Sequence, residues 1–178
     1  VLHNILRGSG TTGLAGIRPV RGIYIRPLIE TSRSEIVEYL RSNNIEWRTD
    51  ETNFHAIYTR NKIRLELIPY LKNNYNISIE SAINRLSGLC REDDDYMHIC
   101  AARAFSECCR TDENGAVKMD KHQFKSLHTA IKRRLLRYVL EYMKIPLKDV
   151  HMTHIDDCIK FLETAQSGSF FRISTCNI

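Results

Sequence analysis

The sequence predicts an α/β segment over residues 1–74 followed by a mostly α-helical segment over residues 75–178. In the first segment, short β-branched and aromatic runs alternate with amphipathic helical stretches, which is typical of a layered α/β domain. A polar break of asparagine and tyrosine follows at residues 73–76. Beyond it, apolar residues recur at helical spacing almost throughout, so we expect two domains with boundaries at 1–74 and 75–178.

The composition favours a globular protein with an anionic partner. A chain of 178 residues can bury a core as one large domain or two small ones. Its hydrophobic fraction of 43% and charged fraction of 26% are ordinary for such proteins. The formal charge is +5, and residues 1–72 hold eleven Lys/Arg against seven Asp/Glu. The first segment is therefore the predicted anion-binding part.

Cysteine usage and hydropathy predict a cytoplasmic protein with free thiols. The six cysteines include no Cys-x-x-Cys pair, and in a chain without a signal peptide we expect such cysteines to be free thiols. No apolar run approaches the roughly 18 residues that a membrane-spanning helix needs, so no membrane partner is expected. We interpret the scattered cysteines as small buried hydrophobic residues.

The first segment opens with the last turns of an amphipathic helix and a glycine-rich loop at residues 7–13. Backbone N–H groups of such loops can face outward, so Arg7, Gly8, Ser9 and Gly10 can hold a phosphate or an adenylate. A plain connection between a helix and a strand is the alternative. The loop lacks the Gly-Lys-Ser/Thr of a Walker motif.

The next elements follow from local signals. Residues 23–29 are β-branched and aromatic and predict a short strand, with Pro27 at an edge or an exit. Ser32 and Glu35 have the spacing of a capping box, which predicts a helix that ends at Asn43–Asn44. Residues 45–47 predict another extended piece.

Residues 50–53 predict an Asx-type turn before the next helix. Asp50 is a candidate general base or magnesium ligand, and Asn53 is a candidate hydrogen-bond partner of a substrate. Turn-forming and capping roles are the alternative for both residues.

A basic helix is predicted from Tyr58 onward. Arg60 and Arg64 stand four residues apart and share one helix face, which suits bidentate capture of phosphate or carboxylate. Asn61 and Lys62 lie between them, and an apolar set is expected to anchor the other face: Ile63, Leu67 and Ile68. A solvated basic face is the alternative. Pro69 is predicted to kink or end this helix near Leu71.

The second segment is predicted to begin with a helix from Ser78 to about Arg110, interrupted by the acidic cluster at residues 92–95. That cluster predicts a solvated face, with a divalent-cation site as the alternative. A turn at 112–115 and a strand at 116–119 follow. Further helices are predicted from Asp120 or Lys121, over 128–144 and over 151–164.

Two clusters in these helices are candidates for binding. In the helix over 128–144, four cations are expected to lie mostly away from the apolar stripe: Lys132, Arg133, Arg134 and Arg137. They form a second candidate RNA patch or a solvated basic face. In the last helix, His151, His154 and Cys158 share one face and are a candidate metal cluster, but a matching second pair of ligands is lacking.

An ordered series of motifs in the first segment resembles the bacterial tRNA(Ile)-lysidine synthetases, which belong to the N-type pyrophosphatase-loop enzymes. The series consists of Leu6-Arg7-Gly8-Ser9-Gly10, Gly13-Leu14-Ala15-Gly16-Ile17, Arg26-Pro27-Leu28, Arg33-Ser34-Glu35-Ile36, Arg48-Thr49-Asp50 with Thr52-Asn53, and Tyr58-Thr59-Arg60-Asn61-Lys62-Ile63-Arg64 with Pro69. Residues 75–178 resemble the family's helical middle domain in pattern more than in motifs, and Ala165-Gln166-Ser167-Gly168 fits it as well.

The resemblance implies the C-terminal part of an adenine nucleotide alpha hydrolase-like domain followed by a helical domain that binds tRNA. It implies a ligase that uses ATP and Mg²⁺ to adenylate C2 of the wobble cytidine in tRNA(Ile) with a CAU anticodon. The amine of free L-lysine then displaces AMP. Arg7, Gly8, Ser9 and Gly10 would lie near the adenylate, and Asp50 and Asn53 would brace a loop. The residues implied to contact the tRNA are Arg60, Asn61, Lys62, Arg64, Arg133 and Arg137.

One departure from the family's pattern concerns catalysis. The Ser-Gly-Gly-x-Asp-Ser loop that cradles ATP in the family does not occur in these 178 residues. Both ends of the sequence also predict a fragment of a longer enzyme, with the ATP loop upstream of Val1. We therefore expect this polypeptide alone to be inactive, and we assign no catalytic residue.

The sequence leaves two alternative functions open, and it also leaves open whether the protein forms a homodimer. One is a non-catalytic RNA-binding helical module. The other is a related tRNA thiolase, although the paired cysteines usual in such enzymes are not apparent.

Overall fold

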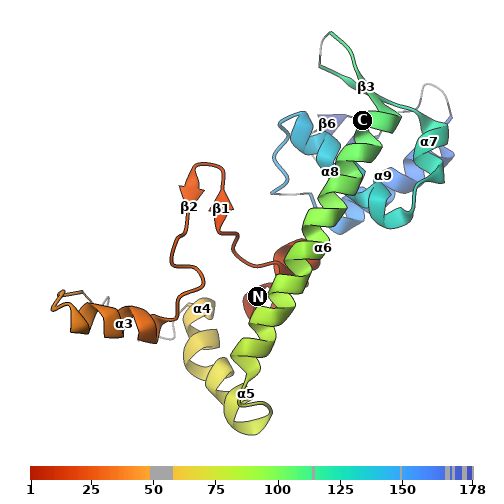
Figure 1. The fold of residues 1–178 in the computed structure, drawn as a ribbon. Helices are drawn as coiled ribbons and strands as arrows, with labels where there is room; N and C mark the ends of the chain where they lie inside the picture. The colour runs from red at the N-terminus through yellow and green to blue at the C-terminus, as the bar shows by residue number, and fades with distance from the viewer. Residues whose placement is uncertain are drawn as a thin grey trace. The chain divides into compact units, whose positions relative to one another are not determined.

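The structure is a computed structural model of the whole chain, and it describes residues 1–48, 58–113, 115–148, 150–166, 169, 171–173 and 176–177. It divides into two compact units, Val1–Asp94 and Asp95–Ile178. The long helix α6 (Ile79–Cys108) is continuous and contributes residues to both units (Figure 1). The coarse order of the fold is as predicted, with the few strands of the first segment followed by a mostly helical chain.

The first unit begins with two short helices, α1 (Leu2–Leu6) and α2 (Thr11–Leu14). Asn4 links them, because its Nδ2 donates to the Gly13 carbonyl over 2.6 Å. Gly13 is required at this contact, since a Cβ there would lie 2.5 Å from the Cβ of Ser9. The glycines of this segment therefore serve close packing as well as turning.

A small antiparallel hairpin follows, formed by β1 (Val20–Arg21) and β2 (Tyr24–Ile25) with Val20 opposite Ile25. The strand predicted over 23–29 is thus too long, and residues 45–47 form no strand. The physical reason is local, because Pro27 has no N–H to donate and the chain turns from there to residue 30.

Helix α3 (Arg33–Ser42) confirms the capping-box prediction. The Ser32 N–H donates to Glu35 Oε2 over 2.7 Å, and the Glu35 N–H donates to Ser32 Oγ over 3.2 Å. Hydrogen bonding of the Glu35 carboxyl to the side chain and then to the backbone of Ser32 lowers its pKa. The helix ends at Asn43 as predicted, and Asn44 takes the left-handed conformation with a φ of 53°.

The basic helix is a continuous run of three parts: α4 (Thr59–Lys62), the π-helical turn η2 (Ile63–Leu67) and α5 (Ile68–Asn74). Pro69 was predicted to kink or end this helix near Leu71, and the predicted end is wrong because α5 runs on to Asn74. Pro69 lies inside this continuous run, and the wider π turn η2 comes directly before it, where the regular hydrogen-bond pattern of an α-helix is already interrupted.

Helix α6 corrects the prediction that the acidic cluster interrupts the second segment, since it runs unbroken from Ile79 to Cys108. Small residues mark its buried face, together with one carboxylate: Ser87, Cys90, Asp94, Ala101, Ala104 and Cys108. None of the helices described in this chain has an apolar stretch sufficient to span a bilayer.

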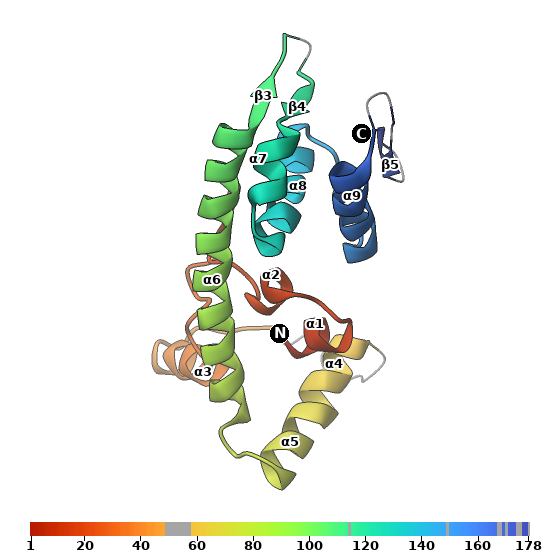
Figure 2. The same cartoon turned by 90° about the vertical axis from the view of Figure 1, so that its right-hand side faces the viewer.

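The second unit continues from α6 into the antiparallel strands β3 (Cys109–Thr111) and β4 (Val117–Met119). Helix α6 therefore ends at Cys108, slightly before the predicted end at about Arg110. The predicted turn and strand after it are confirmed. Helices α7 (Lys121–Ser126), α8 (Thr129–Tyr142) and α9 (Met152–Thr164) pack together beside it (Figure 2). A last hairpin pairs β5 (Arg172–Ile173) with β6 (Cys176–Asn177). The most deeply buried side chains of this unit are Phe124, Leu135, Ile155 and Cys158.

The interpretation of the cysteines as buried hydrophobic residues is confirmed for Cys90, Cys108, Cys109 and Cys158, whereas Cys100 is half-buried. Burial raises the pKa of Cys158 to about 11, and burial with the adjacent Cys108 raises that of Cys109 to about 11.

We expect brief alkylation at pH 8 to modify Cys100 well before Cys109 and Cys158, because the thiolate is the reactive form. Peptide mass spectrometry measures the order, and urea-unfolded protein, in which all thiols should react, is the control. Equal rates in the folded protein would contradict the burial.

Candidate nucleic-acid interface and adenylate loop

The basic helix presents its cations to solvent and its apolar residues to the first unit. Arg60, Lys62 and Arg64 are exposed, and Ile63 is only 9% exposed. Arg60 and Arg64 lie about one helical turn apart. Among the described residues, neither guanidinium has an ion-pair partner, so both are available to an anion. Asn61 lies between them and is partly buried.

The glycine-rich loop differs from its predicted geometry. The N–H groups of Gly8 and Ser9 do not face outward, because they donate over 2.9 Å to the carbonyls of Ile5 and Asn4 and close the end of α1. Gly8 has a φ of 71°, which favours glycine. The exposed guanidinium of Arg7 is also a candidate group for an anion, and its Nη1 lies 3.4 Å from His3 Nε2.

A buried carboxylate on α6 anchors the chain that follows this loop. Asp94 is 5% exposed; its Oδ1 accepts from Thr12 Oγ1 and its Oδ2 from Arg18 Nη2, each over 2.7 Å. One turn earlier, Arg91 Nη2 donates to the carbonyls of Ala15 and Ile17 over 3.4 Å. Residues 12–18 are thus held against α6 by charge-assisted hydrogen bonds.

Sequence reasoning missed Asp94, because it assigned the whole acidic cluster to a solvated face. A signal for its burial exists in the spacing. Asp94 lies four residues after Cys90 and seven before Ala101, on the small-residue stripe of α6. Close approach at this stripe also explains Gly16, where a Cβ would lie 2.8 Å from Ser87 Oγ.

The second basic patch is largely engaged in holding α8 against α9. Lys132 is buried, and its Nζ donates to Glu163 Oε1 over 2.7 Å and lies 5.7 Å from the centre of the Phe124 ring. Arg133 Nε donates to Asp156 Oδ1 over 2.7 Å. The expectation that Lys132 lies away from the apolar face is therefore wrong, since the buried face of α8 includes it with Leu135 and Leu136.

Arg137, the other predicted tRNA contact on α8, is half-buried. Its pKa is lowered by desolvation and by the nearby Arg134, while Glu141 acts in the opposite direction. The structure therefore offers fewer free cations here than on the basic helix.

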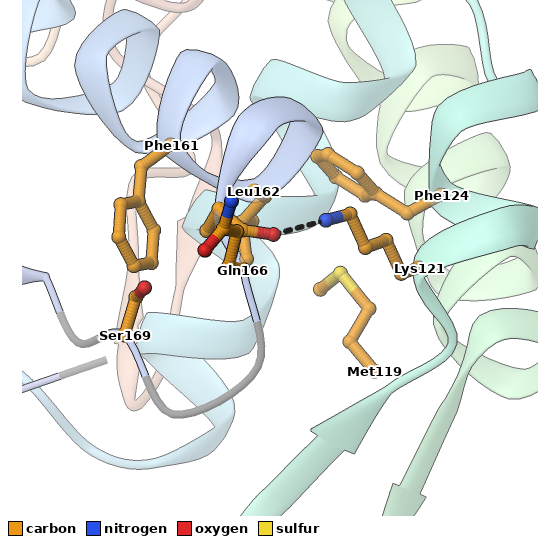
Figure 3. A pocket seen from close by; sticks show the side chains of 8 residues that line it. Met119, Lys121, Phe124, Phe161, Leu162, Gln166 and Ser169 are labelled. Atoms are coloured by element: carbon orange, nitrogen blue, oxygen red, sulfur yellow. Dashed lines mark hydrogen bonds between the residues drawn. The ribbon is translucent and has the colours of Figure 1, made fainter.

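A pocket of about 430 Å³ lies in the second unit, where α7 meets the end of α9 (Figure 3). Lys121 Nζ donates to the Ala165 carbonyl across it over 2.5 Å. Its remaining lining is mostly apolar and consists of Met119, Phe124, Phe161, Leu162, Gln166 and Ser169. Because the Lys121 ammonium group donates to the Ala165 carbonyl, the described lining residues of this pocket offer no free charged group to a substrate.

The remaining candidates give no metal site. His151 and His154 cap the start of α9, where His154 Nδ1 accepts from the His151 N–H, and Cys158 is fully buried. Within the part of the chain that the structure describes, no three His, Cys, Asp or Glu side chains are arranged to hold a metal ion. Asp50 and Asn53 lie outside the described residues.

Known proteins are similar to this chain over most of its length. Residues 1–71 match the family model of the PP-loop domain. The tRNA(Ile)-lysidine synthase of Caldanaerobacter subterraneus subsp. tengcongensis is 42% identical over 169 residues, which are 94% of this chain and 36% of the relative. Those of Clostridium tetani and Clostridioides difficile are 37% and 38% identical over 97% and 93% of this chain, and over 37% and 36% of their own lengths. The chain thus spans little more than a third of these relatives.

Proposed function

We propose that this chain belongs to the tRNA(Ile)-lysidine synthases and forms part of an ATP-dependent ligase that joins lysine to the wobble cytidine of tRNA(Ile). The observation that carries the proposal is the identity of 37–42% to synthases of that name over nearly the whole chain, with a PP-loop match at residues 1–71. A thiolase and a non-catalytic RNA module are not favoured. The unpaired cysteines fit a cytoplasmic location, which belongs to the same proposal.

In this proposal, residues 1–74 contribute to the ATP-dependent domain and residues 75–178 to a helical substrate domain. Arg60 and Arg64 bind RNA phosphates, with Asn61 and Lys62 beside them, because both are exposed guanidinium groups on one helix. Arg7 neutralises the adenylate, next to the turn of Gly8, Ser9 and Gly10. Arg133 and Arg137 are secondary contacts, since both are partly buried and Arg133 is ion-paired.

ATP chemistry in the family's pattern also requires a magnesium ion. No carboxylate cluster in the described ranges fits one. We assign no magnesium ligand to these residues, and the roles of Arg7, Arg60 and Arg64 do not depend on the metal. Asp50 and Asn53 keep their proposed role of bracing the loop before the basic helix.

The RNA-binding proposal is tested with a synthetic anticodon stem-loop that carries CAU. Replacing Arg60 and Arg64 together by Ala should weaken binding roughly tenfold and reduce the slope of log K against log salt concentration by about 1.5 to 2, as expected for two lost phosphate contacts. Fluorescence anisotropy of labelled RNA over a salt series measures both quantities.

A matched control is Lys125→Ala with Lys148→Ala, which removes two exposed cations from the second unit. This pair should leave the affinity and the salt slope nearly unchanged. If the Arg60/Arg64 variant binds like the wild type, the two arginines form a solvated face without a role in RNA binding.

The 178-residue polypeptide alone should give no ATP–pyrophosphate exchange with tRNA(Ile) bearing CAU. The reason is that its sequence contains no Ser-Gly-Gly-x-Asp-Ser loop to cradle the phosphates. An exchange assay with labelled pyrophosphate measures this, with a complete synthase as the positive control. Appreciable exchange would show that the residues present here suffice for adenylation.

A further inference from the structure

The first unit also contains a groove that takes no part in the contacts of Arg7, Arg60 and Arg64. An open groove of about 540 Å³ lies at the end of α3. Residues from the last turn of that helix and from the extended segment after it line the groove: Leu40, Arg41, Asn44, Ile45, Glu46 and Trp47.

Trp47 is the principal apolar surface of this groove. It is the single tryptophan of the chain, and 43% of it is exposed. A large aromatic side chain gains most from burial, so a partly exposed indole beside an exposed Ile45 leaves favourable contact area unused. Such surfaces commonly mark a place where a ligand completes the packing.

The polar groups around Trp47 narrow the choice of ligand. The Arg41 guanidinium lies 5.9 Å from the centre of the indole ring, in cation–π range. Asn44 and Glu46 line the same groove and bring an amide and a carboxylate. An aromatic face with a guanidinium beside it suits a flat, electron-rich ring that carries a phosphate, and the amide and carboxylate suit the polar edge of that ring.

We propose that this groove binds one unpaired nucleobase of the RNA substrate, stacked on the exposed surface of Trp47. The proposal rests on the RNA-binding function proposed above and adds a base-contacting site to the phosphate contacts of Arg60 and Arg64. Arg41 and the exposed Arg48 supply positive charge for the backbone of that nucleotide, whereas Asn44 and Glu46 donate to and accept from its edge. With Arg48 beside the groove, two cations stand against the one carboxylate of Glu46, and this net positive charge favours RNA over an apolar protein segment as the occupant.

The test uses the anticodon stem-loop with CAU and the intrinsic fluorescence of Trp47, which reports only this groove because no other tryptophan exists. Binding should quench Trp47, and RNA should protect it from acrylamide. Trp47→Ala should weaken binding roughly tenfold in the anisotropy assay, whereas Trp47→Phe should retain most of the affinity because a benzene ring still stacks. Tyr39→Ala is the matched control, because it removes an exposed aromatic ring from the neighbouring helix α3, and it should change the affinity little.

Stem-loops with a single abasic nucleotide identify the base. At one loop position the abasic RNA should bind wild type and Trp47→Ala equally, since the partner of Trp47 is gone. Equal effects of Trp47→Ala on every abasic RNA would overturn the stacking. So would a Trp47 that acrylamide cannot reach before RNA is added, because protein would then cover the groove.

The two proposals fail in different ways. Salt-dependent RNA binding that ignores Trp47 overturns the groove and leaves the proposed function standing. Absence of any binding to the stem-loop overturns the RNA-binding function and the groove with it. Quenching of Trp47 by an apolar peptide but not by the stem-loop would assign the groove to a protein partner.

Discussion

Replacing Arg18 by Ala is expected to lower the free energy of unfolding of the first unit by about 3 kcal/mol, the low end of the range for breaking a buried ion pair. Asp94 is 5% exposed and Arg18 is 38% exposed, so the variant removes the cation that compensates a desolvated carboxylate, which still accepts from Thr12. The effect should be local. Hydrogen–deuterium exchange should rise in residues 11–19 and 87–94 more than elsewhere in the unit.

Two further variants separate the loss of the ion pair from the loss of one positive charge. Arg21→Ala removes the same charge from an exposed position on β1 and should change the unfolding free energy by less than about 0.5 kcal/mol. Joint replacement of Arg18 by Met and Asp94 by Leu should recover much of the loss, because no charge is then buried without a partner. An Arg18→Ala protein as stable as the Arg21→Ala protein would show that the ion pair does not hold residues 12–18 in place.

Replacing Glu163 by Ala should destabilise the second unit by a similar amount, about 3 kcal/mol. Lys132 is 8% exposed, and in this variant its ammonium group loses its carboxylate partner, while the centre of the Phe124 ring lies 5.7 Å away. Lys132→Met should be close to neutral by comparison, because an unbranched apolar side chain fills the same space without a charge. Urea unfolding followed by circular dichroism measures both variants.

The control for this pair is Glu113→Ala, which removes an exposed carboxylate from the turn before β4. It should shift the unfolding midpoint little. If Lys132→Met proves as damaging as Glu163→Ala, the contact contributes a specific attraction beyond the avoidance of a buried charge.

Several elements followed from neighbouring residues alone. The capping box of Ser32 and Glu35, the helix start at Asp120 or Lys121 and the turn before β4 were predicted correctly because each depends on hydrogen bonds across two to four residues. The exposed pair Arg60 and Arg64 was predicted for the same reason, since a spacing of four residues places both on one helix face. The ordered motifs of residues 6–69 also suggested the family to which the relatives belong.

Other features depended on residues far away in the chain. Asp94 is buried because Thr12 and Arg18, 82 and 76 positions earlier, pack onto α6 and supply its hydrogen bonds. Lys132 is buried because Glu163 on another helix compensates its charge. A sequence pattern assigns a charged residue to the solvent by default. Tertiary contacts reversed that assignment at both positions, since the free-energy cost of burying a charge depends on the partner that the fold brings to it.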